Sequence, residues 1–199
     1  MAYTANYSSF SRWVLVWFAP SIPFKPTYMQ ADIEGHYLLL QGRLDGKQIL
    51  INSYGPNTDD KQFYLTIQDN VAPVLWLGDF KCIEDGDLDR HPPRQDMKPR
   101  MTHSLQEVRN NLGLYDSWRC MHPTTLEYTC YSPTHGTHSQ LDRILISEDL
   151  RCHLKSVMHL ARYLSDHGTV CCEVSWGPPM PGHRVWRLPA EVLSIPVGK

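Results

Sequence analysis

The chain has 199 residues, which is enough for one domain of ordinary size or for one domain with a tail. Hydrophobic residues make up 42% and charged residues 20%, a balance that excludes a disordered charged polymer and a collagen-like or low-complexity chain. The formal net charge of −2 gives no bulk basicity of the kind that indicates a nucleic-acid partner, although it does not exclude a local basic groove.

The first apolar run extends from Trp13 to Ala19 and is much shorter than the roughly 20 residues that cross a membrane. Pro20 and Pro23 follow it, with large residues between them instead of the small residues of a signal-peptide cleavage site. We therefore predict a buried strand at 13–18, no membrane association and no targeting segment. The strand begins so early that we expect something to precede it in a longer chain.

Further apolar runs predict a series of strands, most of them ended by glycine, proline or acidic residues. The strand at 37–44 connects to the strand at 48–54 through Asp45-Gly46, which is a hairpin turn signal. The remaining predicted strands are at 73–80, 128–131, 141–146 and 168–174.

Helices are predicted between several of these strands, at 58–70, 104–112 and about 149–163. Ser104 is the expected N-cap of the second helix, with Glu107 three residues on and Gly113 at its end. The polar, proline-rich segment 84–100 is expected to be a surface loop, and 114–119 to lead into another loop. Because helices separate strands in this order, the fold class is a mixed α/β domain with sheets covered by helices.

Cysteines and histidines are scattered through the chain. None of the six cysteines forms a C-x-x-C pair, so the spacing of a zinc finger is absent. We expect reduced thiols in an intracellular protein, either nuclear or cytoplasmic.

Polar side chains follow several of the predicted strands. Tyr54 ends one strand, Asp79 ends the next, Asp142 begins another, and Asp166-His167 precedes the last. Ionisable residues at strand ends are where the functional sites of α/β proteins collect. Three carboxylates and one histidine suit a hard divalent cation with a hydrolytic water.

Several short motifs occur in a fixed order along the chain. The motifs are Tyr54-Gly55-Pro56-Asn57, Gly78-Asp79-Phe80, Asp89-Arg90, Leu114 to Arg119, Tyr128-Thr129, Ser139-Gln140-Leu141-Asp142, Ser165-Asp166-His167 and Trp186-Arg187-Leu188. In this order they resemble the endonuclease/exonuclease/phosphatase superfamily and, more narrowly, the apurinic-type endonuclease domain of LINE-type (non-LTR) retrotransposons.

The resemblance implies a DNase I-like fold, a layered α/β sandwich of two mainly antiparallel sheets flanked by helices. The endonuclease-like domain then covers residues 1–176, and residues 177–199 form a linker or tail that would precede a reverse transcriptase. Such a domain carries out metal-dependent phosphodiester hydrolysis of DNA with Mg²⁺ or Mn²⁺. The expected partner is DNA, without a small-molecule cofactor, and the oligomeric state stays open.

The resemblance also implies roles for the residues at the strand ends. Asp79 corresponds to the carboxylate that orients or deprotonates the water, and His167 to the histidine that contacts the phosphate. Asp142 would orient that histidine, Asp166 would join Asp79 on the metal side, and Tyr54 would bind phosphate. The alternatives are turn caps for Asp79 and His167 and a core aromatic for Tyr54.

Five further residues are candidate substrate contacts by resemblance. Arg90, Thr129 and Ser139 are equally well explained by loop structure, and Asn57 by turn chemistry. Lys81 is the fifth candidate. It stands where the family has an asparagine, so an ammonium group would lie beside the expected cation and would pair with Asp79.

Two departures from the family pattern lead to the functional prediction. The chain begins after the family strands that carry an asparagine and a metal-binding glutamate, since its first acidic residue is Asp32. Lys81 is the second departure. We therefore predict an N-terminally truncated copy with impaired hydrolysis; the alternative is a non-catalytic remnant that binds nucleic acid weakly or serves as an interaction fragment. A phosphate-monoester or phospholipid substrate is disfavoured by Asp89-Arg90 and by the segment at 186–188.

Overall fold

The structure is a computed structural model that describes residues 1–8, 11–44, 47–68, 75–94, 98–162 and 165–175. The predicted linker at 177–199 and the Asp45-Gly46 turn lie outside these residues. None of the helices in the described ranges is long and apolar enough to cross a membrane.

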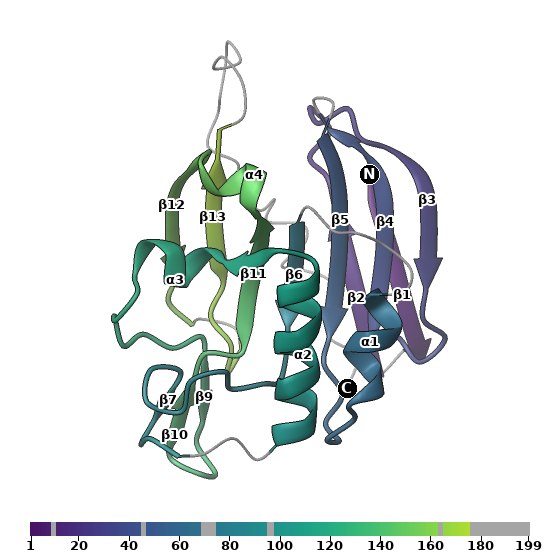
Figure 1. The fold of residues 1–199 in the computed structure, drawn as a ribbon. Coiled ribbons are helices and arrows are strands. Elements are labelled where there is room, and N and C mark those ends of the chain that lie inside the picture. Colours follow the sequence, from purple (N-terminus) through teal and green to yellow (C-terminus); the bar gives the residue numbers. More distant parts are fainter. Residues whose placement is uncertain (9–10, 45–46, 69–74, 95–97, 163–164, 176–199) are drawn as a thin grey trace.

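A six-stranded sheet forms the central layer, with the strand order β3-β4-β5-β6-β11-β8 (Figure 1). Neighbouring strands are antiparallel except β5 and β6, which run parallel. The strands are β3 (Lys25–Ala31), β4 (Tyr37–Leu44), β5 (Lys47–Tyr54), β6 (Leu75–Asp79), β8 (Leu114–Asp116) and β11 (Asp142–Ser147).

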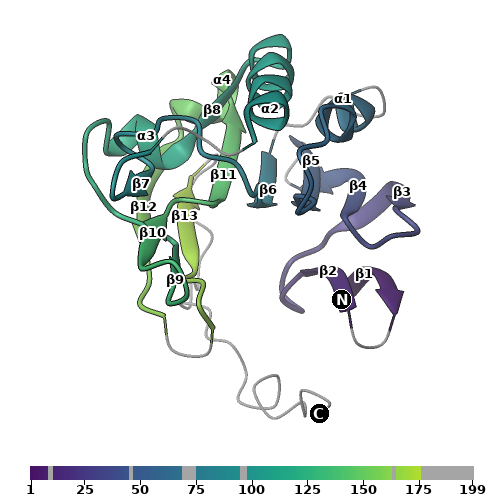
Figure 2. The same ribbon diagram turned by 90° about the horizontal axis from the view of Figure 1, so that it is seen from below.

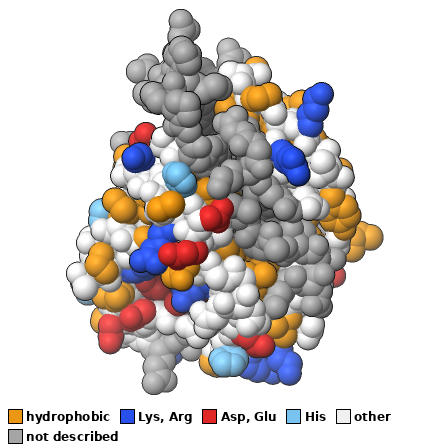
Figure 3. Space-filling model, turned by 45° about the horizontal axis from the view of Figure 1, so that its top comes forward, with side chains coloured by type: hydrophobic (Ala, Val, Ile, Leu, Met, Phe, Trp, Pro, Cys, Tyr) orange, Lys and Arg blue, Asp and Glu red, His pale blue; other side chains and the backbone are white. Residues whose placement is uncertain are grey.

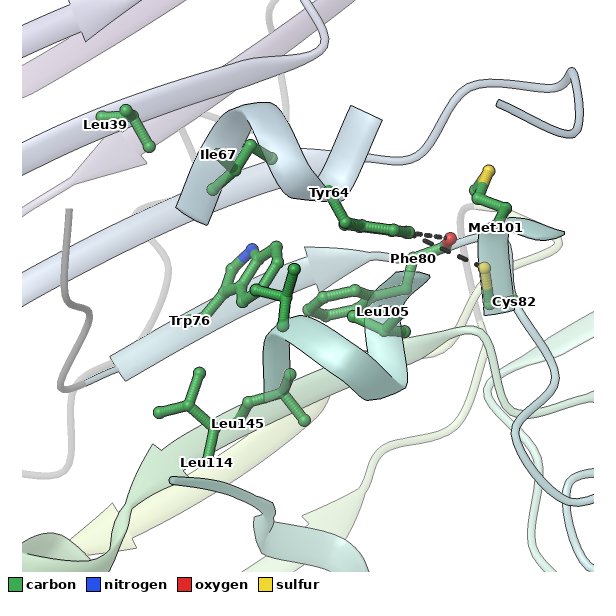
Figure 4. Close-up of a cluster of buried hydrophobic side chains, with 11 residues drawn as sticks. Leu39, Tyr64, Ile67, Trp76, Phe80, Cys82, Met101, Leu105, Leu114 and Leu145 are labelled. Atoms are coloured by element: carbon green, nitrogen blue, oxygen red, sulfur yellow. Dashed lines mark hydrogen bonds between the residues drawn. The ribbon is translucent and has the colours of Figure 1, made fainter. Parts of the chain in front are cut away.

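Two helices, α1 (Gln62–Gln68) and α2 (Pro99–Asn111), cover one face of this sheet. Figure 4 shows their apolar side chains meeting those of the sheet around the fully buried Trp76 of β6. Burying a large aromatic or aliphatic side chain of this kind contributes roughly 1.5–3 kcal/mol. The resulting core, which includes Tyr64, Phe80 and Leu105, fixes the strands whose ends carry the polar residues.

Two short two-stranded sheets lie on the other face (Figure 2). The hairpin of β1 (Ala2–Ser8) and β2 (Ser11–Trp17) packs on β4 and β5 through a second apolar cluster. The other pair is β12 (Leu154–His159) and β13 (Val170–Val174), which lies beside β11.

The remaining elements are short. Strands β7 (Arg90–His91), β9 (Cys130–Ser132) and β10 (Thr137–Ser139) form a three-stranded sheet in the order β7-β10-β9. Helix α3 (Ser117–Met121) packs on β11 and β12, and α4 (Glu148–Arg151) follows β11.

The predicted fold class is confirmed, as is the strand character of all the predicted strand segments. The layer opposite the helices differs in detail, because its described strands form two separate pairs instead of one continuous sheet. Strands β1, β3 and β10 were not predicted, because their sequences are mostly polar or interrupted by proline.

Two helix predictions were wrong, and one further segment holds more regular structure than predicted. Helix α2 begins at Pro99, whose fixed φ suits a first helical turn, and Ser104 lies inside it with its hydroxyl donating to the Arg100 carbonyl. Segment 114–119 leads into a loop as predicted, but it also forms β8 and the start of α3, with Asp116 accepting from the Trp118 backbone N–H as the N-cap. Segment 149–163 contains the end of α4 and strand β12 instead of one helix, because pairing with β13 overrides its helix-like composition.

Gly78 allows β6 to approach β5 directly before Asp79. Its φ is 150°, and a Cβ at this position would lie 1.9 Å from the Ser53 carbonyl oxygen. Glycine is therefore required here, since other residues rarely adopt this φ and have no space beside β5. The close approach places the end of β6 next to the end of β5.

Candidate functional site

Three of the predicted strand-end residues meet at one edge of the central sheet. The parallel pairing of β5 with β6 sets Tyr54 opposite Asp79, and the antiparallel pairing of β6 with β11 sets Asp79 opposite Asp142. The structure therefore brings together residues from three strands, as the sequence pattern predicted.

His167 lies against this group, just before β13. Its Nδ1 atom is 2.7 Å from Oδ2 of Asp142, and its Nε2 atom is 3.9 Å from Oδ2 of Asp79. The hydrogen bond to Asp142, followed by one to Cys130, raises the pKa of His167 to about 10. The imidazole is therefore protonated at neutral pH, with its Nδ1 atom held by Asp142.

Lys81 is the last member of the group and contacts both carboxylate oxygens of Asp79. Its Nζ atom is 2.6 Å from Oδ2 of Asp79 and 5.0 Å from the centre of the Tyr54 ring, and its backbone N–H donates to Oδ1 of Asp79. Burial by itself would lower the pKa of Lys81, but the Asp79 carboxylate outweighs it and the pKa is raised. Burial also raises the pKa of Asp79, despite the opposing effect of Lys81.

The backbone at Lys81 has a left-handed φ of 55°. This region is uncommon for a lysine and several-fold enriched in asparagine. The predicted pairing of Lys81 with Asp79 is thus held by a tight turn directly after β6. This turn places the ammonium group of Lys81 among the side chains at the sheet edge, beside Asp79 and Tyr54.

A divalent metal ion is the group that the fold implies at this edge. Asp79, Asp142 and His167 offer ligand atoms within 4.8 Å of one another. However, both oxygens of Asp79 already accept hydrogen bonds from Lys81, and one oxygen of Asp142 binds His167. With Lys81 in this position, the residues present do not fit a hard cation such as Mg²⁺, which needs free oxygen ligands.

Asp166 and Cys130 form a second group with His167. The exposed Asp166 and the buried Cys130 offer ligand atoms within 4.8 Å of His167 and of each other. Asp79 and Asp166, predicted as joint metal ligands, thus lie in different groups of the described residues. Cys130 was missed because its closeness to His167 comes from a β-bridge, which residue spacing does not reveal.

The other predicted substrate contacts differ in exposure. Asn57 is exposed in a bend after β5, and Arg90 is half-buried in β7 with a buried Nε that has no hydrogen-bond partner. Ser139 is 7% exposed. Thr129 is fully buried, and its hydroxyl accepts from the backbone N–H groups of Leu141 and Asp142. This geometry assigns Thr129 to positioning Asp142 and gives no support to a substrate contact.

A buried ion network lies directly behind Asp142. The fully buried Arg143 places its two terminal nitrogens 2.6 Å from a carboxylate oxygen of Asp89 and of Asp116. Arg119 lies 2.7 Å from the other oxygen of Asp89 and also donates to Gln140. Burial would lower the pKa of Arg143, but these carboxylates outweigh it and raise the pKa. The sequence analysis did not identify this network, whose members come from separate segments.

Known proteins with similar sequences or structures bear on the fold of the chain. No protein-family model matches the chain. The chain is 27% identical over 184 residues to the "Transposon TX1 uncharacterized 149 kDa protein" of Xenopus laevis; the match covers 86% of this chain and 14% of that protein's length.

Solved structures with a similar fold include a 3′-5′ exonuclease (NExo) from Neisseria meningitidis, with a TM-score of 0.61, 20% identity and coverage of 78% of this chain and 71% of that one. A substituted form of NExo from Neisseria, described as a 3′ phosphatase bound to a product DNA hairpin, has a TM-score of 0.57 and 19% identity. The match covers 79% of this chain and 71% of that one. The AP endonuclease LMAP from Leishmania major has a TM-score of 0.58 and 18% identity. The match covers 85% of this chain and 60% of that one. The chain therefore has the DNase I-like fold, and the predicted resemblance is confirmed.

Proposed function

We propose that this chain binds the phosphodiester backbone of DNA at the edge formed by Tyr54, Asp79, Asp142 and His167, and that its hydrolysis of DNA is impaired by Lys81. The observation that carries the proposal is the ion pair between Nζ of Lys81 and Oδ2 of Asp79, 2.6 Å long, inside the group that the fold associates with hydrolysis. An intracellular location, nuclear or cytoplasmic, is part of the same proposal.

Backbone binding rests on the two cations of the group. The His167 imidazolium, held by Asp142, presents its Nε2–H toward Asp79, and the Lys81 ammonium lies beside it. Charge-assisted hydrogen bonds from such donors suit phosphate oxygens. On the face in Figure 3, acidic and basic side chains are interspersed without a large field of one sign. With a net charge of −2 for the chain, recognition would rest on these two local cations.

Impairment follows from the state of Asp79. A carboxylate that prepares a water for attack on phosphorus needs a free oxygen and a raised pKa. Burial raises the pKa of Asp79, but Lys81 opposes this rise. The ammonium group of Lys81 also pairs with Oδ2 of Asp79, the oxygen that faces His167. A bound Mg²⁺ or Mn²⁺ would neutralise phosphate charge. We propose that such an ion binds beside Asp79 only when Lys81 is replaced.

The test is plasmid nicking in Mg²⁺ or Mn²⁺ together with DNA binding by fluorescence anisotropy. The wild type and the charge-matched control Lys155→Asn, at an exposed position of β12, should bind DNA and nick it only slowly. Lys81→Asn should nick about 100-fold faster than the wild type, in line with the usual contribution of a general base. Adding Asp79→Asn to that variant should abolish the gain.

Two results would overturn the proposal. Nicking by the wild type at the rate of Lys81→Asn, or a Lys81→Asn variant as inactive as the wild type, would show that Lys81 is not the cause of impairment. Absence of DNA binding by the wild type would remove the assignment of the site to the phosphodiester backbone.

A further inference from the structure

Cys130 and His167 face each other across a short antiparallel bridge. The backbone N–H of Tyr131 donates to the Asp166 carbonyl at 3.0 Å, and the N–H of Gly168 donates to the Thr129 carbonyl at 2.6 Å. These bonds flank the pair of Cys130 and His167, which makes it a non-hydrogen-bonded pair. In such pairs the Cα atoms are only about 4.5 Å apart and the side chains are closest.

The chemistry of this pair differs from that of the group around Asp79. Cys130 offers a thiolate sulfur, His167 an imidazole nitrogen and Asp166 a carboxylate oxygen, and these atoms lie within 4.8 Å of one another. A mixed set of sulfur, nitrogen and oxygen ligands suits Zn²⁺ and similar soft or borderline ions, whereas Mg²⁺ takes oxygen ligands.

A neighbouring carboxylate supports metal binding by this set. Asp142 holds Nδ1 of His167 at 2.7 Å, which leaves Nε2 for an ion. A carboxylate behind a histidine ligand is the usual partner in zinc sites, because it orients the ring and increases its basicity.

Cys130 is also shielded. Its side chain is 8% exposed, whereas Asp166 lies on the surface beside it. The group therefore has a buried sulfur, a half-buried imidazole and an exposed carboxylate, so an ion can enter from the Asp166 side. Three protein ligands leave a fourth position for water or another small ligand.

We infer that Cys130, Asp166 and His167 form a binding site for a soft divalent cation of the zinc class. The site is distinct in chemistry from the hard-cation site of the fold, although it shares His167. Binding replaces the protons of the Cys130 thiol and the His167 imidazolium by the metal ion and releases those protons to solvent. The inference does not depend on the proposed function.

Co²⁺ titration of the full chain, followed by absorption, tests the site without nucleic acid. The wild type should show a near-ultraviolet thiolate-to-cobalt charge-transfer band that saturates at one equivalent and disappears when Zn²⁺ is added. Cys130→Ser should lose the band. Cys171→Ser, at a half-buried thiol of β13 outside the group, should keep it. Asp142→Asn should weaken Co²⁺ binding by about 10- to 100-fold.

A second measurement on the wild type covers the case in which Cys130→Ser does not fold. Zn²⁺ should protect Cys130 from alkylation by iodoacetamide, as mapped by peptide mass spectrometry, and should leave the exposed Cys152 reactive. A wild type without the band, a band that Cys130→Ser retains, or equal alkylation of Cys130 with and without Zn²⁺ would each overturn the inference. If the band appears while DNA binding fails, the metal site stands and the proposed function falls.

Discussion

Two charged clusters meet at the start of β11, where Asp142 belongs to one and the next residue, Arg143, to the other. The two clusters differ in how far they are exposed to solvent. The network around Arg143 is fully enclosed: Arg143, Asp89 and Asp116 have side chains that are 1–2% exposed. The group around Asp142 is partly open, with side-chain exposures of 20% for Asp142 and 22% for His167. Adjacent residues of one strand point to opposite faces, so Asp142 belongs to one cluster and Arg143 to the other.

The difference separates a structural role from a chemical one. In the Arg143 network both carboxylates pair with the guanidinium of Arg143, and Asp89 pairs with Arg119 as well, so each buried carboxylate is neutralised. In the open group, His167 lies between two carboxylates and a thiol, and its Nε2 is 3.9 Å from Oδ2 of Asp79. We therefore expect substitutions in the first cluster to change stability and those in the second to change binding.

The largest effect is expected from breaking the enclosed network. Arg143→Leu leaves Asp89 and Asp116 buried without their common partner, which should lower the free energy of unfolding by about 3–5 kcal/mol. Urea denaturation measures this change. Arg100→Leu is the control, because its ion pair with Asp59 is exposed and should contribute less than about 1 kcal/mol. Equal losses in the two variants would contradict the distinction.

A smaller effect is expected from acid at His159, which stacks on Trp118 with ring centres 3.9 Å apart. Burial lowers the pKa of His159 to about 4, and both ring nitrogens are buried without a hydrogen-bond partner. His159 therefore becomes protonated near pH 6.5 in the unfolded chain but only near pH 4 in the folded chain. Stability is lost as the pH falls through this window, by about 1–2 kcal/mol after allowance for partial exposure.

His159→Phe should remove this acid dependence and keep the ring contact. Thermal unfolding between about pH 7 and pH 4 measures the slope for both proteins. His167 has little influence in most of that window, because its raised pKa, about 10, gives stability that is complete below pH 6.5 and is lost progressively as the pH rises from 6.5 to 10. The same slope in the wild type and the variant would exclude His159 as the cause.

The smallest effect on stability is expected at Lys81, although it lies in the centre of the open group. Lys81→Asn removes the ion pair with Asp79. The same substitution introduces a residue that adopts a φ of 55° more readily than lysine does. These effects oppose each other, so the free energy of unfolding should change by less than about 1 kcal/mol. Urea denaturation checks this, and a loss comparable to that of Arg143→Leu would show that Lys81 holds the fold together.

The sequence allowed the open group to be predicted but not the enclosed network. Tyr54, Asp79 and Asp142 each flank an apolar strand, and strand ends gather at one sheet edge, so their proximity followed from pattern. Arg143 lies inside a strand and binds partners from a loop and a helix cap, which no periodicity connects.

The same limit explains the missed roles of Cys130 and of segment 149–163. Cys130 meets His167 through a β-bridge between distant segments, and β12 depends on its pairing with β13. Lys81 was recognised as a departure from the family asparagine and as a partner of Asp79. The structure adds the left-handed turn that holds this ion pair.

Binding of Mn²⁺ to the wild type and to Lys81→Asn tests most directly whether the Lys81 ammonium occupies the cation position beside Asp79. Water-proton relaxation enhancement reports the bound ion, and Lys81→Asn combined with Asp79→Asn identifies the part of the signal that depends on Asp79. We predict that only Lys81→Asn shows Asp79-dependent binding. Equally tight Asp79-dependent binding by the wild type would contradict the account, because Lys81 would then leave the cation position free.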